Sequence, residues 1–268
     1  HDTMRVCSDG RFIYVPDEIE RFDSRADNAR LYKCLIRFES GHEEFDTYRF
    51  DLQKLRDRWL RQSDGDEPPP LPAADDRPPA LQSDMERFFA GFSVPELAAD
   101  LFAVFEHGRI RRLFERRYPG IIRDFLPMLQ REGAAIAAAA AAPHPVFLLY
   151  AEIALGLQTT RDSNARRHIR TLRRRFERKT DAPGVPVETS GELVLASYPE
   201  VMSWLEGQGF FSESYPPIVL PFGRALTPAL HLQAHTTFDH AAQNICEKLA
   251  ARGLRVYRSD VCKHLEDN

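Results

Sequence analysis

The sequence predicts a mainly α-helical protein, a helical bundle with little β-structure. Apolar residues recur three, four and seven positions apart through most of the chain, which is the pattern of helices with one buried face. Prolines, glycines and cap residues divide this pattern into segments of helix length. No repeat with a period of 20–50 residues recurs, which excludes a solenoid. The 268 residues are enough for one large domain or two modest ones.

The first part of the chain, residues 1–62, is predicted to hold one strand and two helices. Residues 10–16 alternate apolar side chains on two faces, and we expect both faces of this strand to be covered. Asn28 is the expected cap of a helix that runs to about Phe45. A second helix is expected over residues 51–61.

Residues 63–82 differ in composition from the rest of the chain. They contain six prolines and almost no apolar side chains, and residues 64–86 carry seven acids against one arginine. This composition predicts a flexible, partly polyproline linker or a long surface loop.

Residues 83–180 are predicted to be helical and to pack with residues 1–62. A helix begins at Ser83, and Ser93 is the expected cap of a helix that runs from Pro95 to about Tyr118. Further helices are expected over residues 121–132, 133–142, 146–157 and 161–179.

Residues 181–268 are predicted to form a C-terminal helical segment. Helices are expected near residues 191–205 and 228–252, with a proline-rich irregular stretch over residues 210–221 between them. A strand is expected over residues 254–257.

Composition and charge exclude several classes of protein. Lys and Arg number 36 against 40 Asp and Glu, a net charge of −4, so the overall basic footprint of a nucleic-acid-binding protein is absent. No run of about 18 uncharged apolar residues predicts a membrane span, and no signal peptide opens the chain. Four scattered cysteines favour a reducing cytoplasm. Phosphate-binding glycine loops and a GxSxG elbow are absent, and we expect no cofactor.

One segment partly matches a zinc-peptidase motif. In that motif His, Glu and a second His lie on one helix, because residues four apart share a face and one metal. Phe38-Glu39-Ser40-Gly41-His42 keeps the Glu and the second His but has Phe in place of the first His. Glu106 is the candidate distant ligand. The motif thus suggests a degenerate zinc-peptidase-like helical scaffold, or, alternatively, pairing of Glu39 and His42 with Arg37 or Arg109.

A second group of candidate metal ligands is His231, His235 and His240. The first two are four residues apart and would share a helix face. No glutamate follows the first histidine, so the hydrolytic base of the peptidase motif is missing. An exposed helix with spare histidines is the simpler interpretation.

The predicted helix over residues 161–179 has eight Arg and one Lys against two acids, a net charge of +7. Ile169, Leu172 and Phe176 form a narrow apolar stripe that would dock it. The remaining face predicts a charged docking surface for a partner, since the guanidinium fork binds carboxylates and phosphates in pairs. Pairing with the acidic residues 64–86, or with RNA or a membrane, is the alternative; no aromatics alternate with the arginines to stack on bases. The candidate partner-binding residues are Arg166, Arg167, Arg170, Arg173 and Arg174.

Three segments match a known pattern in order and spacing. The first combines residues 15–33 with Gly41-His42-Glu43-Glu44-Phe45-Asp46-Thr47 and Phe50-Asp51-Leu52. The second combines residues 101–110, which include Glu106-His107-Gly108-Arg109, with Arg117-Tyr118-Pro119-Gly120 and Arg123-Asp124. The third is Tyr257-Arg258-Ser259-Asp260-Val261-Cys262. Together they cover about a third of the chain and resemble the N-terminal region of NorD/CbbO-type proteins.

The chain also departs from the pattern of that family. Asp46 stands where the family usually has Gly, and His107-Gly108 where it has Asp-Ala. Family members carry a von Willebrand factor A domain with an Asp-x-Ser-x-Ser metal motif, which this chain lacks. Residues 181–268 are the part that would lead into such a domain.

The resemblance implies an adaptor. Proteins of this family work with a hexameric MoxR-type AAA+ ATPase, and the pair remodels a client enzyme: inhibited Rubisco in the CbbO branch, nitric oxide reductase in the NorD branch. We therefore expect a non-catalytic cytoplasmic adaptor, with a slight preference for Rubisco as the client. The alternatives are a zinc metallopeptidase and an RNA-binding module built on residues 161–179.

Overall fold

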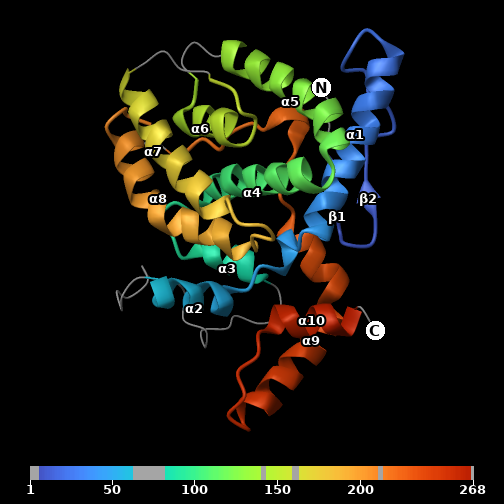
Figure 1. Ribbon diagram of the computed structural model, residues 1–268, viewed down its shortest axis with the longest axis vertical. Coiled ribbons are helices and arrows are strands. Elements are labelled where there is room, and N and C mark those ends of the chain that lie inside the picture. Colours follow the sequence, from blue (N-terminus) through green and yellow to red (C-terminus); the bar gives the residue numbers. More distant parts are fainter. Residues whose placement is uncertain (1–5, 63–81, 140–142, 159–162, 211–213, 267–268) are drawn as a thin grey trace.

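The computed structural model describes residues 6–62, 82–139, 143–158, 163–210 and 214–266, and these are mainly helical, as predicted (Figure 1). The predicted linker lies almost entirely outside the described residues. The helices are α1 (Arg25–Glu44), α2 (Leu52–Gln62), α3 (Asp84–Ala90), α4 (Pro95–Arg117), α5 (Pro119–Ala139), α6 (Pro145–Ile153), α7 (Ser163–Thr180), α8 (Glu188–Glu206), α9 (Pro228–Ala250) and α10 (Arg258–Glu266), with short 3-10 turns η1 (Thr47–Arg49) and η2 (Pro221–Gly223).

Helix α4 is the centre of the fold. It packs against α1, α3, α5, α6, α7 and α8, and in Figure 1 it crosses the middle of the molecule. Consecutive residues from Leu101 to Ile110 are all buried, so α4 has no solvent-facing side over this stretch. One apolar core runs from Val6 to Phe222 and takes side chains from all three helical parts of the sequence. Residues 1–62, 83–180 and the start of 181–268 therefore share a single core.

The β-structure is one small hairpin. Strand β1 (Cys7–Ser8) pairs antiparallel with β2 (Ile13–Tyr14), and Cys7 lies opposite Tyr14. The expectation that both faces of residues 10–16 are covered is wrong: Phe12 is 66 % exposed and Tyr14 50 % exposed. Ile13 and Val15 do pack against the core. A two-stranded hairpin has only one face to dock, so the other stays in solvent.

The predicted strand over residues 254–257 is also wrong. These residues form an irregular turn between α9 and α10, with no strand beside them in the described part of the chain. A strand without a pairing partner leaves its backbone groups to water, so the turn is the stable alternative. Helix α10, which follows, was not predicted.

Two predicted helix caps are corrected. Helix α1 begins after Ser24, whose side chain accepts from the Asp27 backbone N–H. Asn28 lies inside α1 and instead accepts from the backbone N–H groups of Arg21 and Phe22, so it fixes the incoming chain. Helix α4 begins after Val94 without a side-chain cap, because the Ser93 hydroxyl bonds the Tyr198 hydroxyl across the core.

Helix α5 joins two predicted helices into one. It runs from Pro119 to Ala139 and contains Pro127 in its interior. A proline removes one helical hydrogen bond. Phe125, Met128 and Leu129 are buried around that position, and their tertiary packing keeps the helix continuous.

Candidate functional site

Helix α7 docks by the predicted apolar stripe. Ile169, Leu172 and Phe176 are buried, as is Ala165 one turn earlier. The docking is close: a Cβ added at Gly108 of α4 would lie 2.8 Å from the Phe176 ring and from Ile153. On its flank, Arg175 donates to the Ala196 carbonyl and the Ser197 hydroxyl of α8.

The opposite face of α7 carries a stripe of exposed arginines. Arg167, Arg170, Arg174 and Arg178 are spaced three, four and four residues apart, so they lie on one side of the helix. Within the described part of the chain, none of these four side chains has an ion-pair or hydrogen-bond partner. We call these four residues the arginine stripe. Unpaired guanidinium groups in one row form a surface that fits carboxylates or phosphates.

The five arginines predicted to bind a partner do not all behave alike. Arg166, Arg167, Arg170 and Arg174 are exposed. Arg173 pairs within the protein, with Glu152 at 3.0 Å and Glu177 at 3.1 Å. Arg178 was not among the five, although its i+4 spacing from Arg174 places it in the stripe.

Glu106, the candidate distant zinc ligand, lies in a buried ion pair. Arg109, one turn later on α4, donates to both carboxylate oxygens at 2.6 and 2.8 Å. The hydroxyls of Thr47 and Ser190 donate to the same carboxylate at 2.5 and 2.8 Å. Both oxygens of Glu106 are thus occupied by protein donors, which removes Glu106 from a metal's reach. The expected partnership of Arg109 with Glu39 or His42 is replaced by this pair.

His42 and His107 are buried side by side in the same polar region. Their ring centroids lie 5.4 Å apart; the His42 Nδ1 is 3.2 Å from the Thr47 hydroxyl, and the His107 Nδ1 is 3.1 Å from the Tyr150 hydroxyl. Burial, and next the Arg224 cation, lower the pKa of both histidines well below the ordinary value. Both rings are therefore neutral at physiological pH and act as hydrogen-bonding parts of the core.

Glu39 and Arg224 are buried without full pairing. Glu39 accepts a hydrogen bond from the Ser8 backbone N–H, but its Oε1 has no partner in the described structure. Burial raises the pKa of Glu39 to about 7, opposed by Arg224. The Arg224 guanidinium stacks 4.0 Å above the Phe38 ring, and its Nη2 also lacks a hydrogen-bond partner.

The histidine group on α9 is only partly described. His231 is buried and stacks on Tyr48 with ring centroids 3.6 Å apart. The side chains of His235 and His240 lie outside the described residues. Across the described side chains, no group of three or more His, Cys, Asp and Glu is arranged to hold a metal ion.

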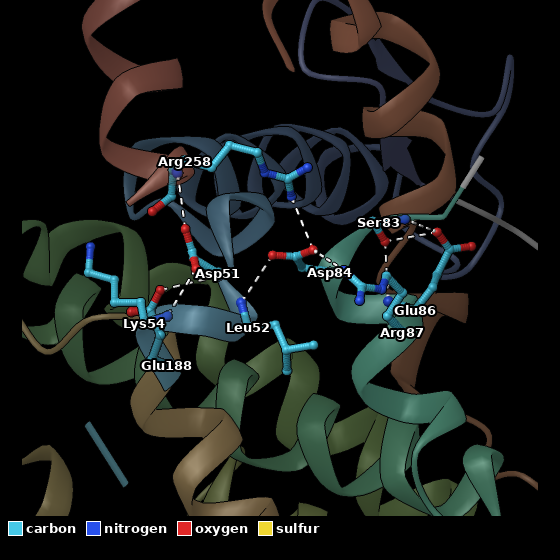
Figure 2. Close-up of polar contacts among 10 residues, drawn as sticks. Asp51, Leu52, Lys54, Ser83, Asp84, Glu86, Arg87, Glu188 and Arg258 are labelled. Atoms are coloured by element: carbon cyan, nitrogen blue, oxygen red, sulfur yellow. Dashed lines mark hydrogen bonds and ion pairs between the residues drawn. The ribbon is translucent and has the colours of Figure 1, made fainter. Parts of the chain in front are cut away.

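A cluster of carboxylates joins four helix starts (Figure 2). Asp51 accepts from the Lys54 backbone N–H at the start of α2 and from the Ser259 N–H at the start of α10. Asp84, in the first turn of α3, accepts from the Leu52 N–H and pairs with Arg258 at 3.2 Å. Glu188, the first residue of α8, accepts from the Asp51 N–H.

These carboxylates sit where helix dipoles favour them. The free N–H groups of a first helical turn carry partial positive charge, so an acid there caps the helix and is stabilised. Burial, its largest cause, nevertheless raises the pKa of Glu188 to about 7, and the neighbouring Asp51 charge adds to this. The cluster links the starts of four helices, and no sequence pattern predicted it.

A cleft of about 330 Å³ opens beside this cluster. Its walls come from the loop after α1, the start of α2, the last turns of α4, the loop before α8 and helix α10. Charged side chains of both signs line it: Glu44, Asp46, Arg49, Lys54, Arg109, Arg117, Glu188, Asp260 and Lys263. Most of these charges pair with one another, for example Lys54 with Asp260 at 2.8 Å and Lys263 with Asp46 at 2.7 Å.

Comparison with known proteins finds no matching family model, no similar curated protein and no similar solved structure. Among the described helices, none combines the length and the apolar character that a membrane crossing requires.

The sequence did not predict Arg224 or the cluster of Asp51, Asp84 and Glu188, and it marked His107 only as a departure from the family pattern. Arg224 lies in the irregular stretch before α9, where no periodic pattern marks a residue as buried. The only available signal at Asp51 and Asp84 is their position just before or at a helix start, which is also typical of ordinary caps.

Proposed function

We propose that this protein is a non-catalytic adaptor that docks on a MoxR-type AAA+ ATPase and couples it to the remodelling of a client enzyme. The observation that carries the proposal is the arginine stripe on α7. Four exposed guanidinium groups in one row, without partners in the described residues, are a surface for an acidic partner.

The chemistry of the stripe favours a protein partner over nucleic acid. Single-stranded nucleic acid is usually held by basic groups together with aromatic side chains that stack on bases. No aromatic residue is exposed on α7, where the only one, Phe176, is buried. The overall charge of −4 also opposes general binding to polyanions.

The arrangement of the resembling segments supports the NorD/CbbO comparison. The first and second segments meet through the His42, Thr47 and Glu106 contacts and through the Tyr118 hydroxyl, which donates to Glu44 at 2.8 Å. The first and third meet where Asp51 accepts from the Ser259 N–H. Segments that are far apart in sequence thus contact one another.

Asp46 adds a second supporting observation. Its backbone has φ 58° and ψ 30°, in the left-handed region. Glycine adopts this region most readily, and NorD/CbbO-type proteins usually have glycine at this position. Asp46 therefore differs from the family in residue type, but its backbone has the conformation that favours glycine.

The zinc-peptidase alternative is weakened by the same geometry. Its third ligand, Glu106, is held by Arg109, Thr47 and Ser190. Its first histidine position is occupied by Phe38, whose ring stacks with Phe114 and Arg224.

The proposal is tested with the triple variant Arg167→Gln, Arg170→Gln, Arg174→Gln. We expect its Kd for a MoxR-type ATPase to rise about ten-fold or more at low salt, and the salt dependence of binding to decrease, because exposed charges steer and hold partners electrostatically. The measurement is a binding titration at several salt concentrations. The matched control is Arg25→Gln, Arg123→Gln, Arg252→Gln, three exposed arginines away from α7.

Two outcomes would contradict the assignment. Unchanged ATPase binding by the stripe variant would remove the stripe as the docking surface. Retention of RNA on a filter at low salt by the parent protein, lost in the stripe variant, would favour the RNA-binding alternative. If the stripe variant loses ATPase binding as expected, reactivation assays with inhibited Rubisco and with nitric oxide reductase would identify the client.

A further inference from the structure

The C-terminal part of the chain lies outside the apolar core. We define the C-terminal arm as residues 241–266, from the second half of α9 through α10; these helices lie at one end of the molecule's long axis (Figure 1). Ala242 and Cys262 of the arm are buried. No described side chain of residues 241–265 belongs to the main apolar core or packs against it, although α9 also passes close to α3. Leu254 and Val256, in the turn between the two helices, are exposed. The main apolar core therefore contributes little to holding the arm in place.

Charged and polar contacts hold the arm instead. Four aspartates between residues 46 and 84, which we call the aspartate row, each bind a group of the arm. The contacts are Asp46 to Lys263 at 2.7 Å, Asp51 to the Ser259 N–H at 3.1 Å, Asp57 to Arg255 at 3.2 Å and to the Tyr257 hydroxyl at 3.1 Å, and Asp84 to Arg258 at 3.2 Å. Lys54 adds a pair of opposite polarity with Asp260.

The aspartates of the row are also held by contacts that do not involve the arm. Asp51 and Asp84 accept backbone N–H groups at the start of α2, and Asp57 accepts from the Gln53 side chain (Figure 2 shows the first two). Their partners on the arm are more exposed: the Arg255 side chain is 75 % exposed and the Lys263 side chain 48 %. Ion pairs with one exposed partner are weak and are screened by salt.

We propose that the C-terminal arm is an ionic latch, which is closed on the aspartate row at low ionic strength and opens when these charges are screened or removed. Helix α10 supplies Ser259, Asp260 and Lys263 to the wall of the 330 Å³ cleft. Opening of the arm therefore removes this wall and exposes other residues that line the cleft, among them Lys54 and Glu188. This inference rests on the aspartate row and not on the arginine stripe of α7, so it does not depend on the proposed docking to an ATPase.

The test is hydrogen–deuterium exchange of the full chain, read by mass spectrometry at about 0.01 M and about 1 M NaCl, where the Debye length is about 30 Å and about 3 Å. We expect exchange in peptides covering residues 241–266 to be at least about ten-fold faster at high salt, while peptides from α4 do not change, because local opening without global unfolding speeds only the opened segment. The triple variant Arg255→Gln, Arg258→Gln, Lys263→Gln should exchange rapidly in the arm already at low salt.

The matched control is Lys248→Gln, Arg252→Gln, which removes two exposed charges of the same arm that have no partner in the described residues. The control should behave as the parent chain does. Slow exchange of the arm at both salt concentrations, or in the triple variant, would overturn the proposal. So would equal acceleration of the arm and of α4, since that would show global unfolding instead of a latch.

Discussion

At the scale of single residues, the buried pair Glu106–Arg109 shows why a motif match did not become a metal site. A buried carboxylate needs a cation or several donors, and α4 supplies a cation one turn later. We predict that Glu106→Leu and Arg109→Met each destabilise the protein by about 3–5 kcal/mol, because each leaves a buried charge without its partner. Urea unfolding measures this.

The double variant distinguishes a pair from two independent residues. With both charges removed, the loss should be smaller than the sum of the single losses by about 1–3 kcal/mol. Strictly additive losses would mean that Glu106 and Arg109 do not act as a pair.

Glu39 supports a prediction of pH dependence. Burial raises its folded-state pKa to about 7, above the ordinary value of 4.5. Between these two values the folded state binds the proton more tightly than the unfolded state, so this group lowers stability as the pH rises through that window. Glu39→Gln should therefore gain stability relative to the parent by roughly 1 kcal/mol per pH unit between pH 5 and 7, and no more above it.

The comparison with the parent chain is needed because His42 and His107 act in the other direction. Their lowered pKa values reduce stability as the pH falls below the ordinary histidine value. The measurement is urea unfolding of both proteins from pH 5 to 8. A difference in unfolding free energy that does not vary with pH would show that Glu39 titrates normally.

At the scale of the elements, close packing of α1 on α4 depends on Gly41. A Cβ added there would overlap the ring of Phe114, with Phe114 Cζ only 2.5 Å away. Although alanine favours helix by about 1 kcal/mol over glycine, we predict that Gly41→Ala destabilises the protein by about 1–3 kcal/mol, because the Phe114 ring must move within a filled core. Thermal or urea unfolding checks it.

Gly120 is the control for this prediction. It also lies in a helix, but an added Cβ would meet no atom within 4 Å. Gly120→Ala should leave stability unchanged or raise it by up to about 1 kcal/mol. Equal effects at the two positions would show that backbone propensity, and not packing, decides the result.

At the scale of the whole molecule, two parts are held together by different forces. The helices around α4 share one apolar core that reaches from Val6 to Phe222. The C-terminal arm is held by the aspartate row. Apolar burial is insensitive to screening, whereas exposed ion pairs are sensitive to it. We therefore expect high salt to speed hydrogen exchange in the C-terminal arm and to leave exchange in α4 unchanged.

The helical class, the position of most helices and the docking face of α7 could be predicted from the sequence alone. These features depend on local spacing: Ile169, Leu172 and Phe176 predicted the buried stripe. Of the five arginines predicted on the other face, all but Arg173 are exposed, and the exposed Arg178 was not predicted. The N-caps predicted at Asn28 and Ser93 were wrong. The hydrogen bonds of these two side chains depend on which groups lie beside them in space, and the local sequence does not specify those groups.

Which charges are paired depends on the packing of the helices and could not be predicted from the sequence. Glu106 has the residue type and helix position of a metal ligand, and its contacts with Thr47 and Ser190 cross 59 and 84 residues of sequence. The stripe residues Arg167, Arg170 and Arg174 have the same residue type as Arg175 on the same helix, yet only Arg175 reaches α8. Whether a charged side chain is paired or free depends on the groups within a few ångströms of it. Separation along the sequence does not specify those groups.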